Sequence, residues 1–249
     1  MKMANTTVFA VAEIHRMIRR ARRAGELRQD EFEPQGWSVC SIDPRQLLAI
    51  FDSLRLKEGF ALRAYQFKEG GNGNAFVYAM PADCPLPEPR ECLTDDSRFL
   101  APPIPMGSLD DFMEAIEGDG TPWSYLSASL MSREMSEIGA MWHGAGWSTH
   151  RLLGRNPLSR VSERRTKRNG GIDDLPDLER GPWEWVGEEP KVWRPAVTVG
   201  DDSVEVMFHT YSGHGKESIY RHVDSYRIGV YCFSSERTVI AGGPGGYIF

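Results

Sequence analysis

The chain has 249 residues, of which 41% are hydrophobic and 26% charged, and its formal net charge is −6. This length is enough for one large domain or two small ones with a buried core, and the composition argues against a disordered chain. No apolar run approaches the roughly 18 residues of a membrane-spanning helix, and the acidic balance argues against nucleic acid as the main partner.

The first predicted element is an amphipathic helix near the N-terminus, ended by Gly25. Its apolar stripe recurs at helical spacing and consists of Val8, Val11, Ile14, Ile18 and Ala21. Its other face carries Arg16, Arg19, Arg20, Arg22 and Arg23. Such a face can bind a membrane, nucleic acid or an acidic partner, but we favour a helix docked on the core with solvated arginines.

The N-terminal stretch lacks the features of a secretory signal, since its apolar part is short and arginines follow it. The four cysteines are Cys40, Cys84, Cys92 and Cys232. They show neither CxxC spacing nor a histidine at zinc-finger distance. We therefore expect a cytoplasmic protein with reduced thiols, and a disulfide between Cys84 and Cys92 remains an alternative.

A short helix and a β-hairpin come next. Asp43 and Pro44 are typical of a helix N-terminus, with Leu47, Leu48, Phe51 and Leu54 as its buried stripe. The segments 60–67 and 75–80 are strand-like and enclose the turn sequence 70–73, which predicts a hairpin. The proline-rich stretch 81–105 is expected to be a surface loop.

Two further helices are predicted, from Ser108 through Ile116 and from Thr121 to about Ala140. A strand is expected over 147–153. The stretch 156–182 that follows is charged, aperiodic and rich in glycine and proline, which predicts a linker or exposed loop. It contains the basic cluster 164–168, which would be the site of any nucleic-acid binding but is more simply paired with the acidic residues after it.

The last third of the chain is expected to be β-structure, with strands over 193–199, 204–211, 226–233 and 238–241. The predicted class is α+β, with a mostly antiparallel sheet (an N-terminal hairpin plus a C-terminal β-meander) packed with about four helices. We expect a helical and hairpin region over 1–155, a charged linker over 156–182, and a meander over 183–249 that shares one core with the first region.

The first candidate site is the histidine-rich stretch that runs from Phe208 to Asp224. Strand alternation predicts that His209 lies on the non-core face, and a chain reversal at 213–215 can bring His222 and Asp224 close to it. Two imidazoles and a carboxylate can hold a divalent metal or act as acid and base. Cross-strand polar pairing on an exposed face explains the same residues without a function.

The second candidate is Glu134, which falls inside the apolar arc of the helix over 123–140, with Glu137 close by. A carboxylate in apolar surroundings must be paired, protonated or bound to a metal. We consider a catalytic or metal-binding role, and the alternative that both glutamates lie at an exposed edge.

Three tryptophans, Trp183, Trp185 and Trp193, lie close together just before the meander. They can line a ligand pocket or pack where the linker enters the core. No motif identifies a reaction. The leading hypothesis is a non-catalytic protein that binds a small molecule or a protein partner. The alternatives are a metal-assisted or acid–base hydrolase, with a divalent metal as its possible cofactor, and nucleic-acid binding through the basic loop.

Overall fold

The computed structural model describes residues 5–27, 35–93, 102–159 and 182–248. Its elements are α-helices and mostly antiparallel strands, which confirms the mixed α+β class expected from the sequence. The chain divides into two compact units, each assembled from separate stretches of sequence. Unit 1 comprises Met1–Arg16, Thr149–Tyr226 and Ser234–Phe249, and unit 2 comprises Met17–Ser148 and Arg227–Phe233.

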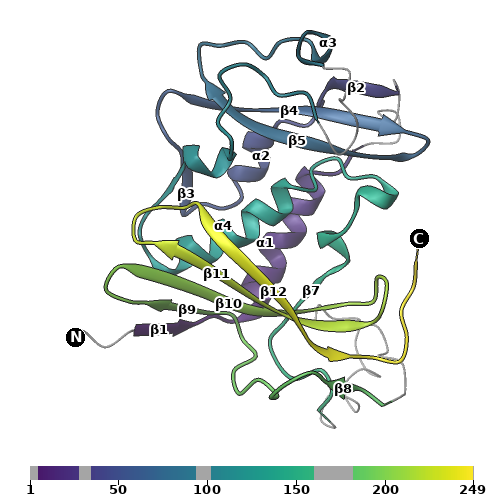
Figure 1. The fold of residues 1–249 in the computed structure, drawn as a ribbon. Helices are drawn as coiled ribbons and strands as arrows, with labels where there is room; N and C mark the ends of the chain where they lie inside the picture. Colours follow the sequence, from purple (N-terminus) through teal and green to yellow (C-terminus); the bar gives the residue numbers. More distant parts are fainter. Residues whose placement is uncertain (1–4, 28–34, 94–101, 160–181, 249) are drawn as a thin grey trace. The chain divides into compact units, whose positions relative to one another are not determined.

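Unit 1 is built on a seven-stranded sheet (Figure 1). Its strands are β1 (Asn5–Val8), β7 (Arg151–Leu153), β8 (Glu184–Trp185), β9 (Ala196–Val199), β10 (Ser203–Ser212), β11 (Ser218–Arg227) and β12 (Phe233–Gly242). The order is β1-β9-β10-β11-β12-β8, so β9 to β12 are neighbours in chain order. Because β9 pairs only with residues 204–207 of β10, β7 can pair with residues 209–211 further along the same strand.

The two halves of β10 have different surroundings. Residues 203–206 alternate between exposed and buried, as in a sheet with one solvated face. From Phe208 to Ser212 every residue is buried, so both faces of the sheet are covered there. The sequence pattern predicted a non-core face at His209, and this expectation is wrong, because residues far away in the chain cover that face.

The N-terminal segment also differs from its prediction. Val8 was expected in the first helix, but it lies in β1, where it pairs with Ala196 of β9. Helix α1 (Val11–Ala24) begins three residues later and ends before Gly25, whose N–H is bonded to the Ala21 carbonyl. The remaining stripe at Ile14, Ile18 and Ala21 is buried as predicted.

Unit 2 contains two smaller sheets and most of the helical structure. One sheet has the order β2-β4-β5 and the other pairs β3 with β6, both antiparallel. The strands are β2 (Gly36–Val39), β3 (Leu54–Leu56), β4 (Phe60–Glu69), β5 (Asn72–Pro81) and β6 (Ile116–Gly118). The helices are α2 (Pro44–Leu48), α3 (Pro89–Cys92), α4 (Pro122–Met135) and the 3₁₀ turns η2 (Phe112–Ala115), η3 (Trp142–Gly144) and η4 (Trp147–Thr149).

Local sequence signals account for several helix and strand ends in unit 2. The side chains of Asp43 and Thr121 cap α2 and α4 by accepting backbone N–H bonds. Strands β4 and β5 are joined at Gly70 and Gly71, both with positive φ, which glycine adopts without strain. Helix α4 ends at Met135, earlier than predicted.

The segment Arg227–Phe233, which joins β11 to β12, belongs to unit 2. Two tyrosines hold it there. The Tyr231 ring stacks on Tyr125 of α4 with centroids 4.9 Å apart. The Tyr231 hydroxyl lies 2.7 Å from Ser124 Oγ and accepts the Gly120 N–H. These contacts hold the connection against the start of α4.

Candidate functional site

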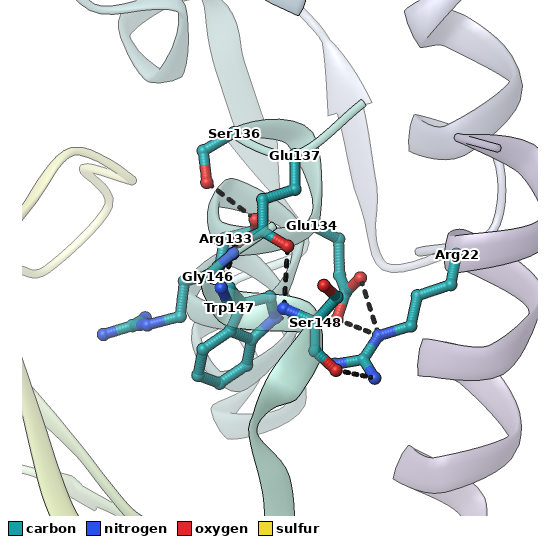
Figure 2. Close-up of polar contacts among 8 residues, drawn as sticks. All are labelled: Arg22, Arg133, Glu134, Ser136, Glu137, Gly146, Trp147 and Ser148. Atoms are coloured by element: carbon teal, nitrogen blue, oxygen red, sulfur yellow. Dashed lines mark hydrogen bonds and ion pairs between the residues drawn. The ribbon is translucent and has the colours of Figure 1, made fainter. Parts of the chain in front are cut away.

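Glu134 is buried in unit 2, with 4% of its surface exposed. The Arg22 guanidinium of α1 donates to both of its oxygens, at 3.3 and 3.4 Å, and the Trp147 indole N–H donates to Oε1 at 2.7 Å (Figure 2). Burial raises the pKa of Glu134, and the neighbouring Arg22 charge and Trp147 bond only partly oppose this. Of the three fates open to a buried carboxylate, the structure shows pairing, and its partner is an arginine that the sequence pattern had assigned to solvent.

Glu137 makes a different set of bonds, to backbone groups. Its carboxylate accepts the N–H groups of Gly146, Trp147 and Ser148 (Figure 2). The Ser148 carbonyl accepts a bond from Arg22, so the loop is also held from α1. The two glutamates therefore tie the loop after η3 to α4 and to the turn that follows α4, and this network explains them without a ligand.

The predicted histidine site is divided between the two faces of the unit 1 sheet. His209 lies opposite Leu153 on β7, and its neighbour Thr210 lies opposite Leu152. The His222 ring stacks on Phe208 with centroids 4.8 Å apart, and its Nε2 lies 2.8 Å from Thr210 Oγ1. Because adjacent strand residues point to opposite faces, His222 lies on the Thr210 face, and the structure does not bring His209 and His222 together.

On the Thr210 face, two imidazoles flank one hydroxyl. His150 Nδ1 and His222 Nε2 each lie 2.8 Å from Thr210 Oγ1, and all three residues are buried. Asp224, two residues after His222 on β11, is fully buried on the same side of that strand. This chain of hydrogen bonds can move a proton between imidazoles, so the acid–base chemistry expected of His222 would involve His150 and Thr210.

On the His209 face lies a group that we call the tryptophan-covered cluster. It consists of Trp183, Trp185, Trp193, His209, Tyr211 and Glu217. The centroid of the Trp193 ring lies 5.2 Å from that of His209. The Trp185 ring lies on Trp193, with centroids 6.2 Å apart. Tyr211 donates its hydroxyl to Glu217 Oε1 at 2.8 Å.

Two members of the tryptophan-covered cluster hold buried polar atoms that lack a well-formed hydrogen bond. His209 is 1% exposed, and beyond a weak contact with the Trp193 backbone its ring nitrogens make no well-formed hydrogen bond among the described residues. Glu217 is 2% exposed, and its Oε2 likewise has none within the part of the chain that the structure describes. Burial lowers the pKa of His209 to about 4, and a weak hydrogen bond with the Trp193 backbone opposes this only in part, so the imidazole is neutral at pH 7. Burial, with the Glu217 contact adding to it, raises the pKa of Tyr211.

Sequence reasoning found part of this cluster and missed the rest. The spacing of the three tryptophans pointed to a possible pocket lining, and His209 was singled out. Glu217 had no sequence signal, because it is placed by the C-terminal segment: its N–H is bonded to the Gly245 carbonyl and its carbonyl to the Gly243 N–H. His150 and Thr210 were missed because each lies in an ordinary strand or loop sequence.

Other predictions have these outcomes. The basic cluster 164–168 and most of the predicted linker lie outside the described residues. None of the four cysteines, all of which lie in the described ranges, forms a disulfide. No group of three or more His, Cys, Asp or Glu side chains in the described ranges is arranged to hold a metal ion, and no helix there is long and apolar enough to cross a membrane.

Comparison with known proteins identifies neither a family nor a function. No protein-family model matches the sequence, and neither a curated protein nor a solved structure matches it.

Proposed function

We propose that this protein is a non-catalytic binding protein that takes up a small organic molecule at the tryptophan-covered cluster of unit 1. The observation that carries the proposal is Glu217 Oε2, a buried oxygen without a partner in the described structure, together with the two His209 ring nitrogens, which make no well-formed hydrogen bond there. Buried polar groups in folded proteins are nearly always hydrogen-bonded, so such a set is typical of a site completed by another molecule.

Buried polar groups without hydrogen bonds lower the stability of the ligand-free protein. Each buried donor or acceptor without a partner costs about 1–3 kcal/mol. A ligand that supplies the missing bonds recovers this free energy on binding, while the tryptophan and tyrosine rings contribute apolar contact. The cluster therefore combines a few polar groups with several aromatic rings, the residue types that small-molecule sites use.

Strand β8 is the element through which a ligand can enter. It has only two residues, lies at the edge of the sheet, and carries Trp185, with Trp183 just before it. Its ladder consists of Ala241↔Trp185 and Gly242↔Glu184. So short an edge strand opens locally at low free-energy cost, and both tryptophans are only partly buried.

The test compares His209→Phe with the wild type. Phenylalanine keeps the ring and removes both nitrogens, so the ligand-free protein should gain about 1–2 kcal/mol in urea denaturation. His222→Phe is the matched control: the same exchange should destabilise, because it leaves the Thr210 hydroxyl without one of its two imidazole contacts.

Binding itself is measured by thermal shift against a panel of small aromatic and aliphatic amines, alcohols and carboxylates. We expect at least one class to raise the Tm of the wild type and to lose that effect in His209→Phe. A panel without effect, together with a destabilised His209→Phe, would refute the proposal, because the ring nitrogens would then already be satisfied.

An acid–base hydrolase is the second candidate, and the observation that favours it is the hydrogen-bonded series His150, Thr210 and His222. We rank it below binding because these side chains are buried and mutually satisfied. Hydrolysis of a p-nitrophenyl ester that disappears in His222→Ala would support it. We keep the cytoplasmic location predicted from the sequence as part of this proposal, and its support is that the four cysteines form no disulfide.

A further inference from the structure

Glu217 is fixed in place by backbone bonds on both sides. It follows the turn at 214–216, and its own N–H and carbonyl are bonded to Gly245 and Gly243 of the C-terminal segment. A methyl group on Gly243 would lie 2.5 Å from Glu217 Oε2 and 2.7 Å from Trp183 Cζ2. The free oxygen and the Trp183 ring therefore both lie beside Gly243, where a larger residue would displace one of these side chains.

The carboxylate at this point has no counter-charge within the described part of the chain. Its hydrogen bond there is the one from Tyr211, a neutral phenol. Lys216 precedes it in sequence, but its ammonium lies beside Gly242, 3.4 Å from where a methyl group would be, and does not bond to Oε2. A buried carboxylate is costly unless a cation or several donors stabilise it.

Two aromatic residues lie beside this carboxylate: Trp183 is near Oε2, and the Tyr211 hydroxyl is bonded to Oε1. The Trp183 and Tyr211 rings have centroids 6.4 Å apart at an angle of 49°. Ring faces attract ammonium groups, most strongly where water is excluded. A carboxylate oxygen flanked by tryptophan and tyrosine suits a protonated amine, which can donate to the oxygen while its carbon chain packs on the rings.

We infer that the ligand of the tryptophan-covered cluster is an organic cation, with a protonated amine that donates to Glu217 Oε2 beside Trp183 and Tyr211. This inference rests on the proposed function and names its ligand class. His209, neutral at pH 7 and two residues from Tyr211 on the same face of β10, supplies a hydrogen-bonding group for the uncharged end of the molecule.

The test uses pairs of probes that differ only in charge: phenethylamine against 2-phenylethanol, and n-pentylamine against n-pentanol. Binding is followed by tryptophan fluorescence and calorimetry at pH 7, where both amines are protonated. We expect each amine to bind about tenfold to a hundredfold more tightly than its alcohol, since a hydrogen bond to a charged group contributes that much.

The variant Glu217→Gln keeps an acceptor for the Tyr211 hydroxyl and removes the charge, so the preference for amines should fall to less than about threefold. Glu236→Gln is the matched control, because it makes the same change at an exposed position of β12 and should leave the preference intact. The comparison of probes on the wild type needs no variant and stands even if Glu217→Gln folds poorly.

The outcomes separate this inference from the function on which it rests. Equal binding of amine and alcohol to the wild type, or a preference that survives in Glu217→Gln, overturns the cationic ligand and leaves small-molecule binding in place. Binding of carboxylates or alcohols but not amines overturns it in the same way. Failure of every member of the panel to bind, together with a destabilised His209→Phe, overturns both.

Discussion

Removal of Arg22 should show how the buried Glu134 carboxylate is stabilised. Arg22→Met keeps the unbranched chain that packs in α1 and removes the charge that faces Glu134. Breaking a fully buried ion pair costs about 3–5 kcal/mol, but 31% of the Arg22 side chain is exposed and water screens part of the interaction. We therefore expect a loss of about 2 kcal/mol in the free energy of unfolding at pH 7.

The companion change, Glu134→Gln, should be much milder. The amide oxygen can still accept from the Trp147 indole, and a neutral group no longer bears the cost of a buried charge. We expect a change within about 1 kcal/mol of the wild type. The double variant should then be more stable than Arg22→Met alone, with a coupling free energy of about 1–2 kcal/mol in a double-mutant cycle.

The pH dependence follows from the direction of the pKa shift. Burial raises the pKa of Glu134 in the folded protein above its unfolded value, so the folded state holds this proton more tightly. The carboxyl therefore favours folding below the unfolded-state pKa, and that contribution is lost as the pH rises through the folded-state pKa. Without Arg22 the folded-state pKa rises further, and the destabilisation of Arg22→Met should be small near pH 4 and largest at pH 7.

Urea denaturation of the four proteins at pH 4, 5, 6 and 7 measures each of these quantities. The reasoning is refuted if the two single changes are additive, or if Arg22→Met is as destabilising at pH 4 as at pH 7. Either result would mean that Arg22 acts through packing or its bond to the Ser148 carbonyl rather than through its charge on Glu134.

Two further changes test the other buried polar networks. Tyr231→Phe should destabilise by about 1–2 kcal/mol in urea denaturation, because the buried Ser124 hydroxyl loses its 2.7 Å partner, and Ser124→Ala in the same background should recover part of the loss. Thr210→Val should cost about 2–4 kcal/mol, since it removes at unchanged volume the hydrogen bonds that His150 and His222 each make with this hydroxyl. If Thr210→Val leaves the free energy of unfolding unchanged, this hydroxyl does not link the two imidazoles.

Several features of the fold could be derived from the sequence because they depend on residues close together in the chain. The caps at Asp43 and Thr121, the turn at Gly70–Gly71 and the end of α1 at Gly25 are all local, and the structure has them where the sequence predicted them. The α+β class follows from the same short-range patterns of hydrophobic and turn residues. Burial of Glu134 could also be predicted, since helical periodicity alone places it on the apolar side of α4.

The functional arrangement was decided by pairings over long distances in the chain. Alternation along β10 correctly separates His209 from Thr210, but only the tryptophans from positions 183–193 make the His209 face buried. Val8 joins a strand rather than a helix because β9, nearly 190 residues later, offers it a partner. Glu217 is positioned by the C-terminal glycines. Local propensity is a weak preference that tertiary contacts override, so which side chains lack a partner can be known only once the distant segments are in place.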